Sequence, residues 1–246
     1  MERKLALAVP EKGAALSEMK RFFAMTEADI FLFPEGFLEE EDLPRALELS
    51  REQGKFFIAG LVQRGERSCQ KAVVVDNGEL IGEYQKNILA PSEREKGRQP
   101  GEKIHCIDTR FGRIGIPICY ELHFPEVSRI MSLDAPCCLV NLIGTGMYHE
   151  LQYTQWLTLA KARAIENEVY VFGCSHANGE LPIAFAIAPD GSLLGEQKNE
   201  PGCLVVTADL SKSHAKTYRY LEDRLPDRFQ RLVEEQGAIG NSIAAK

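Results

Sequence analysis

Short apolar runs, each closed by proline, glycine or polar residues, alternate with helix-periodic segments along most of this chain. Runs of this length are typical of buried strands, and apolar residues at helical spacing are typical of helices that cover a sheet. Two pairs of runs are joined by tight turns, at residues 76–79 and 189–192, which predict antiparallel hairpins. No internal repeat is visible. The pattern predicts an α/β protein with mixed sheets rather than a doubly wound parallel fold.

The expected elements follow from this pattern. Residues 86–101 are polar and predict a long loop, of the kind that often carries function. A polar helical tail is expected from about residue 210 to residue 246. Helices are expected at 15–25, 43–53, 124–133 and 150–167, and strands at 5–9, 28–33, 55–62, 72–75, 80–84, 104–107, 114–118, 137–142, 169–172, 184–188, 193–194 and 203–208.

Composition narrows the class of protein. A chain of 246 residues suits one sizeable α/β domain, and its net charge of −7, without a basic stripe, argues against a nucleic-acid partner. Seven cysteines, an odd number with no CxxC pair, predict a reducing compartment rather than a disulfide framework. No signal peptide is visible, and the apolar runs are too short to span a membrane. We therefore expect a cytoplasmic protein.

Three reactive side chains are placed at the ends of predicted strands. Cys119 ends the strand at 114–118, Glu35 follows the strand at 28–33, and Lys86 follows the strand at 80–84. A carboxylate can take a proton from a thiol, and an ammonium can stabilise both a thiolate and an oxyanion. Taken singly, these residues also fit a buried core cysteine, an exposed acid and a surface lysine. Taken together, they favour an acyl-transfer site without histidine.

The histidines give a weaker signal. None of them has metal-ligand spacing on a common helix face, and we expect a structural or surface role for all except His123, which lies beside Cys119. The chain also has no glycine-rich phosphate-binding motif. The five histidines are His105, His123, His149, His176 and His214.

Six blocks occur in order along nearly the whole chain: 33–35, 84–89 with 100–101, 118–126, 162–167 with 170–171, 188–191, and 218–224. The third reads Ile-Cys-Tyr-Glu-Leu-His-Phe-Pro-Glu. Together these blocks resemble those of the carbon–nitrogen hydrolase (nitrilase) superfamily, in its amidase-like branch. The resemblance implies a four-layer α-β-β-α sandwich in one domain, residues 1–246, with a tail that packs on the domain or on a partner subunit.

The same resemblance implies an activity. The family cleaves a non-peptide C–N bond of a small amide, or a carbamoyl amine, and releases ammonia or an amine and a carboxylic acid. It implies Cys119 as the nucleophile, Glu35 as the base, and Lys86 with the backbone N–H of Tyr120 as oxyanion donors. It also implies no metal, no organic cofactor, and a homodimer or higher homo-oligomer. Hydrolysis of a nitrile, acyl transfer to an amine, and a non-catalytic oligomerisation module remain as alternatives.

Some positions are less well defined by the resemblance. The family often has a second glutamate beyond the lysine; Glu93 and Glu95 are candidates, and the spacing favours Glu93. Glu121, His123 and Asn141 are candidate substrate-binding residues. Many members have an arginine in place of His123 and an aspartate in place of Glu121, and residues 141–147 lack a tryptophan that is common there. We therefore make no prediction of a specific substrate.

Overall fold

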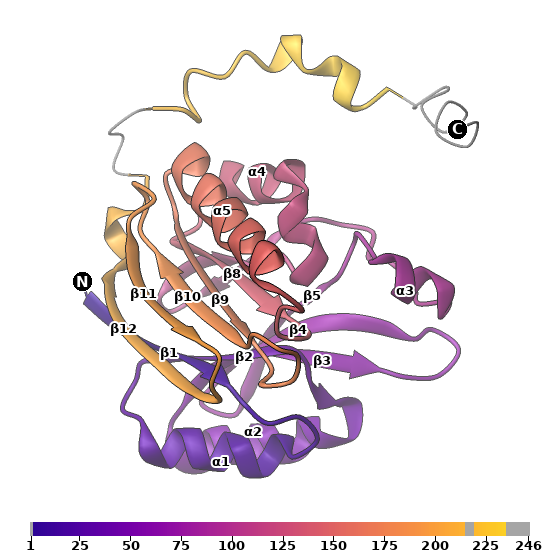
Figure 1. Ribbon diagram of the computed structural model, residues 1–246, viewed down its shortest axis with the longest axis vertical. Helices are drawn as coiled ribbons and strands as arrows, with labels where there is room; N and C mark the ends of the chain where they lie inside the picture. Colours follow the sequence, from indigo (N-terminus) through magenta and orange to yellow (C-terminus); the bar gives the residue numbers. More distant parts are fainter. Residues whose placement is uncertain (1, 215–218, 235–246) are drawn as a thin grey trace.

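Two six-stranded sheets pack face to face in the computed structural model, which describes residues 2–214 and 219–234 (Figure 1). The first sheet has the order β12 (Gly202–Asp209), β1 (Glu2–Val9), β2 (Ile30–Glu39), β3 (Phe56–Gln63), β4 (Cys69–Asp76), β5 (Glu79–Gln85). The second has the order β11 (Leu193–Lys198), β10 (Ile183–Ile187), β9 (Tyr170–Ser175), β8 (Cys138–Ile143), β7 (Gly112–Gly115), β6 (Cys106–Thr109).

The two sheets share one pairing pattern. In the first, β1 pairs antiparallel with β12, the pairs β1–β2 and β2–β3 are parallel, and β3–β4 and β4–β5 are antiparallel. In the second, β6–β7 is antiparallel, β7–β8 and β8–β9 are parallel, and β9–β10 and β10–β11 are antiparallel. The expected mixed sheets, including both predicted hairpins, are confirmed.

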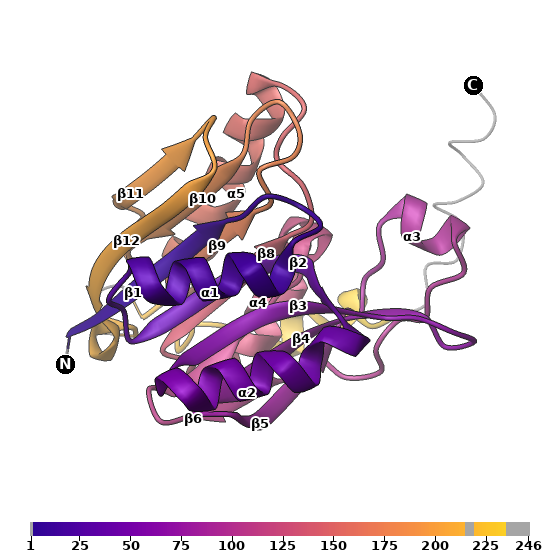
Figure 2. The ribbon, with the colours of Figure 1, turned by 90° about the horizontal axis from the view of Figure 1, so that it is seen from below.

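Helices cover the outer face of each sheet. Figure 2 shows α1 (Ala15–Met25) and α2 (Leu43–Gln53) on the first sheet, and α4 (Pro125–Leu133) and α5 (Glu150–Asn167) lie on the second. Side chains on a strand alternate between faces, so Leu5 and Leu7 enter the core between the sheets whereas Ala6 packs under α1 and α2. The predicted four-layer α-β-β-α sandwich is therefore confirmed.

The elements around the candidate site depart from the predicted ones. The expected strand 114–118 ends at Gly115, because Pro117 has no backbone N–H to donate to a ladder, and Ile118 forms only an isolated bridge with Leu142. A 3₁₀ turn, Cys119–His123, follows directly. The predicted strand at 104–107 is shifted to β6. The predicted loop 86–101 contains a short helix, α3 (Pro91–Glu95).

The C-terminal segment also differs from its prediction. Residues 219–234 contain two 3₁₀ turns, Pro226–Arg228 and Gln230–Leu232, in place of the expected helix. Tyr218, part of the last resembling block, lies outside the described residues, as do residues 235–246. Among the helices of the described segments, none has the length and apolarity that a membrane span requires.

Candidate active site

Lys86 joins two carboxylates in the interior of the protein. It follows β5 directly, and its Nζ lies 2.8 Å from Glu35 Oε1 and 2.8 Å from Glu93 Oε2. Its side chain is 1% exposed, so water does not compete for these bonds. Burial alone would lower the pKa of Lys86, but Glu35, Cys119 and Glu93 outweigh burial and raise it. Lys86 is therefore held as an ammonium.

Glu93 occupies this position because of α3. Pro91 opens the helix, and the Glu93 carboxylate accepts a hydrogen bond of 2.8 Å from the Ala90 backbone N–H, as a glutamate at the third helical position does. The Pro-Ser-Glu order at 91–93 is the sequence signal for this helix start. Glu95 is exposed. Of the two candidate second glutamates, the structure brings Glu93 to Lys86.

Cys119 lies at the first position of the 3₁₀ turn with a strained backbone. Its φ is 47°, in the left-handed region that residues with a Cβ rarely adopt and that is often found at functional sites. Its thiol is hydrogen-bonded to the Glu35 carboxylate, and its sulfur accepts a hydrogen bond from the backbone N–H of Gly144. Burial, followed by the charge of Glu35, raises the pKa of this thiol well above its ordinary value. The resting group is thus a neutral thiol in contact with a carboxylate.

Glycines make room for Glu35. This residue lies within β2, at a shift in register between Phe33 and Leu38, rather than after the strand as expected. A Cβ atom on Gly60 of β3 would collide with the Glu35 backbone, and one on Gly144 would lie 2.5 Å from Glu35 Oε2. A side chain at either position would therefore displace the carboxylate.

A cavity of about 380 Å³ opens over these groups. Glu35, Lys86, Glu93 and Cys119 line it, together with uncharged residues from the turn at Cys119, the loop after β8 and the start of α5. Its size suits a small molecule. The uncharged lining comprises Ala90, Ser92, Tyr120, His123, Ile143, Gly144, Thr145, Met147, Tyr148, Gln152, Gln155 and Trp156.

The structure places His123 and Tyr120 in this cavity. The His123 ring meets Trp156 edge-on, with centroids 5.0 Å apart, and lies 5.4 Å from the Tyr120 ring. Its Nδ1 is 3.2 Å from the Tyr120 carbonyl oxygen. Partial burial, with a smaller contribution from Arg163, lowers the pKa of His123 below its ordinary value. The imidazole is therefore neutral near pH 7.

Glu121 does not line the cavity, which corrects its assignment as a substrate-binding residue. Its carboxylate is fully buried and accepts backbone N–H groups from Ile118 at 2.7 Å, Asn87 at 2.7 Å and Ile88 at 3.1 Å. The Tyr84 hydroxyl donates to it at 3.0 Å. Glu121 thereby ties the segment after Lys86 to the residue before Cys119.

Asn141 is also outside the cavity, which corrects the second such assignment. This residue of β8 is fully buried. Its Nδ2 donates to the carbonyl oxygens of Pro117 at 2.7 Å and Cys119 at 3.3 Å. Asn141 fixes the chain on both sides of Ile118 and so sets the position of the thiol.

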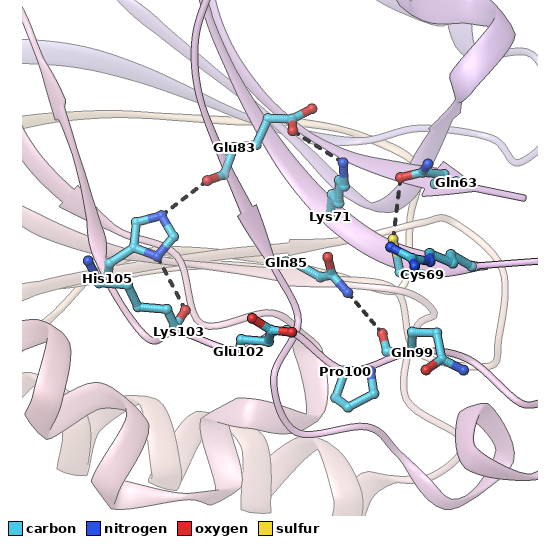
Figure 3. A pocket seen from close by; sticks show the side chains of 12 residues that line it. Gln63, Cys69, Lys71, Glu83, Gln85, Gln99, Pro100, Glu102, Lys103 and His105 are labelled. Atoms are coloured by element: carbon cyan, nitrogen blue, oxygen red, sulfur yellow. Dashed lines mark hydrogen bonds and ion pairs between the residues drawn. The ribbon is translucent and has the colours of Figure 1, made fainter.

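A second cavity, larger at about 750 Å³, lies beside β4 and β5 (Figure 3). Its polar groups pair with one another: Lys71 with Glu83 at 3.2 Å, and Gln85 Nε2 with the Gln99 carbonyl at 3.1 Å. Burial raises the pKa of its thiol, Cys69, and that thiol donates to the Gln63 amide oxygen at 3.5 Å rather than to a base. Within the described ranges, no group of three or more His, Cys, Asp and Glu side chains is placed to hold a metal. The cavity at Cys119 is therefore the candidate active site.

Comparison with known proteins identifies the family of the chain. The sequence model of the carbon-nitrogen hydrolase family matches residues 14–220, which include all four charged and thiol groups of the cavity. The chain belongs to the carbon-nitrogen hydrolase family.

Individual relatives of this carbon-nitrogen hydrolase are distant. It is 31% identical to probable nitrilase C965.09 of Schizosaccharomyces pombe over 65% of the chain and 61% of that protein. It is 28% identical to omega-amidase NIT3 of Saccharomyces cerevisiae over 58% of the chain and 53% of that protein. The alignments thus span about three fifths and one half of these two curated relatives.

A solved structure shows the same fold. The carbon-nitrogen hydrolase from Helicobacter pylori G27 superposes with a TM-score of 0.84 at 18% identity, covering 96% of this chain and 99% of that one.

Sequence reasoning did not single out His176 in this carbon-nitrogen hydrolase domain. His176 follows β9, is 2% exposed, and its Nε2 is 3.1 Å from the backbone carbonyl oxygen of Glu35. Burial lowers the pKa of His176 to about 4, so the ring is neutral and donates from Nε2 to this carbonyl. The two residues are 141 positions apart, so no local pattern could have indicated the contact.

Proposed function

We propose that this chain hydrolyses the C–N bond of a small amide through a thioester at Cys119. The observation that supports this most directly is the chain of contacts in one cavity: the Cys119 thiol meets Glu35, and Lys86 bonds both Glu35 and Glu93. A base, a nucleophile and a fixed cation within contact of each other are the parts that acyl transfer requires.

The first half of the reaction forms the acyl-enzyme. Glu35 takes the thiol proton as the Cys119 sulfur attacks the amide carbon. The pKa of the thiol is raised, so a general base is needed at this step rather than a preformed thiolate. The negative charge that develops on the carbonyl oxygen is met by Lys86 Nζ and by the Tyr120 backbone N–H.

The position of Tyr120 in the turn supports this assignment of its N–H. The first hydrogen bond of the 3₁₀ turn runs from the Glu121 N–H to the Ile118 carbonyl at 3.0 Å. Tyr120 comes before Glu121, so its N–H has no acceptor within the turn. As the tetrahedral intermediate collapses, the C–N bond breaks and the nitrogen takes the proton held by Glu35. Ammonia or an amine leaves, and the acyl group remains on the sulfur.

The second half consumes water. Glu35 takes a proton from water, the hydroxyl attacks the thioester carbon, and the C–S bond breaks. The proton returns to the sulfur and a carboxylic acid is released. Glu35 thus acts twice, and we assign Glu93 to holding the ammonium of Lys86 and Glu121 and Asn141 to positioning the turn.

Ammonia release from a panel of small amides and nitriles tests the proposal. Wild type should release ammonia, and Cys119→Ala should release none. Rapid-quench mass spectrometry of wild type during turnover should find the acyl group of the substrate on Cys119, and Glu35→Gln, which lacks the base for both halves of the reaction, should release no ammonia. Ammonia release that persists in Cys119→Ala would contradict the thioester route. Product analysis separates hydrolysis from acyl transfer to an added amine.

Assembly and compartment belong to the same proposal. We assign the protein to the cytoplasm, supported by seven cysteines that are all free. We also propose a homodimer or higher homo-oligomer to which the tail at about 210–246 contributes. In its described part, Leu225, Leu232 and Val233 expose 64%, 66% and 86% of their surface, so these apolar side chains are available to pack on a partner subunit. Light scattering of the full chain and of a variant with these three residues changed to serine tests the assembly.

A further inference from the structure

The cavity at Cys119 has only one cation among the described residues that line it. That cation, Lys86, is already bonded to Glu35 and Glu93. The formal charges that face the cavity are thus two negative and one positive. A carboxylate on a substrate would therefore meet no unpaired positive group and would add a third negative charge.

His123 supplies a neutral group in this lining. Its Nδ1 faces the Tyr120 carbonyl oxygen at 3.2 Å, a contact that requires a proton on Nδ1. The other nitrogen, Nε2, then carries a lone pair and can only accept a hydrogen bond. His123 lines the cavity and is exposed, so a substrate can reach it, but it presents an acceptor and not a charge.

The remaining walls are also uncharged. Ile143, Met147 and the face of Trp156 provide apolar surface, and Gln152 and Gln155 provide amides. Arg163 does not line the cavity: its Nε donates to the Leu122 carbonyl at 3.1 Å and its Nη1 pairs with Glu166 at 3.0 Å.

We infer that the site selects amides whose acyl part carries no negative charge, and that His123 is a residue that sets this selectivity. The inference rests on the proposed function. Amides that carry a carboxylate at the far end of the molecule are therefore excluded as preferred substrates of this chain, although one of its relatives is named an omega-amidase. The preferred substrates are neutral amides that offer a hydrogen-bond donor to His123 Nε2.

Two isosteric pairs of amides test the selectivity: succinamide against succinamate, and glutaramide against glutaramate. Each pair differs only by an amide in place of a carboxylate. Ammonia release by wild type at pH 7.5 should give a kcat/KM about tenfold or more higher for the neutral member, since an unpaired like charge in a desolvated site is strongly disfavoured. In parallel, each compound is tested for protection of Cys119 from iodoacetamide, and the neutral member should protect at lower concentration.

A charge-introducing variant tests the role of His123. His123→Arg should raise kcat/KM for the carboxylate members about tenfold and so reduce the selectivity. His105→Arg adds the same charge beside the other cavity and should leave the ratio unchanged. An unchanged ratio in His123→Arg would contradict the role of His123.

Different results would contradict the substrate selectivity and the amidase activity. Release of ammonia that depends on Cys119 but favours succinamate or glutaramate would overturn the selectivity and leave the amidase proposal standing. If wild type hydrolyses no amide or nitrile and Cys119 gains no acyl group, the proposed function fails. Absence of both turnover and protection with either diamide overturns the selectivity proposal.

Discussion

A methyl group on Gly144 would lie 2.5 Å from Glu35 Oε2. The carboxylate cannot retreat freely, because its other oxygen is bonded to Lys86 at 2.8 Å and the side chain is 7% exposed. Residue 144, in the loop after β8, therefore must have no side chain if Glu35 is to reach the thiol.

We expect Gly144→Ala to lower kcat about 100-fold or more, because displaced base and nucleophile lose their alignment. The displaced carboxylate also weakens its buried bond to Lys86, so the free energy of unfolding should fall by about 1–3 kcal/mol. Ammonia release and urea denaturation measure the two effects. The control for kcat is Gly65→Ala, whose added methyl meets nothing within 4 Å; its φ of +100° adds a backbone cost, so its unfolding free energy is not compared. Equal loss of activity in both variants would contradict the steric argument.

The two candidate second glutamates can be compared directly. Glu93→Gln keeps an acceptor for the Ala90 N–H but removes one of the two negative charges on Lys86, and we expect kcat/KM to fall about 10- to 100-fold. Glu95→Gln makes the same chemical change at an exposed position and should leave kcat/KM unchanged. A loss confined to Glu95→Gln would reverse the assignment.

Substitution of Glu121 should lower the stability of the protein, because this residue binds backbone N–H groups and does not line the cavity. Glu121→Leu leaves the buried N–H of Ile118 and the partly buried N–H groups of Asn87 and Ile88 without this acceptor and should lower the free energy of unfolding by about 4 kcal/mol. Glu121→Gln keeps one acceptor oxygen and should cost about half as much. Urea denaturation measures both variants, and a Leu variant as stable as wild type would show that water reaches these donors.

His176 predicts a pH dependence of stability. The native ring has a pKa of about 4, whereas an unfolded histidine titrates near its ordinary value of 6.5. Between these values the unfolded chain binds more protons, so this contribution is complete above pH 6.5 and is lost as the pH falls toward 4. The loss should reach about 3 kcal/mol.

A histidine-to-glutamine pair isolates this effect. His176→Gln should show a shallower fall in unfolding free energy between pH 6.5 and pH 4 than wild type, whereas His105→Gln should follow the wild-type curve. Parallel curves for His176→Gln and wild type would mean that the native ring titrates normally.

The mixed sheets and the helices that cover them were predictable from the sequence, because helical and strand periodicities report which side of an element is buried, whereas the four-layer arrangement followed from the family resemblance. The four helices that cover the sheets show this clearly. Local periodicity could not show that Pro117 stops β7 and turns Cys119 into the first residue of a 3₁₀ turn. It also could not tell whether a buried Glu121 or Asn141 faces the cavity or the backbone, since that depends on packing between distant segments.

Glu93 illustrates an intermediate case. The spacing from Lys86 favoured it over Glu95, and the Pro-Ser-Glu order could have shown which residue begins a helix with its carboxylate turned inward. His176 lies at the other extreme, because its contact with Glu35 joins the two sheets and leaves no trace in neighbouring residues.

The two matching sheets have a consequence for how the reactive thiol comes into being. The first contributes Glu35, and the segment after its edge strand contributes Lys86 and Glu93, while Cys119 follows a strand of the second. During synthesis the acid and the ammonium emerge from the ribosome before the sulfur, and the sulfur meets no base until the second half has docked. Cys119 therefore gains its base and its cation only when the two sheets pack together, so turnover would report that packing.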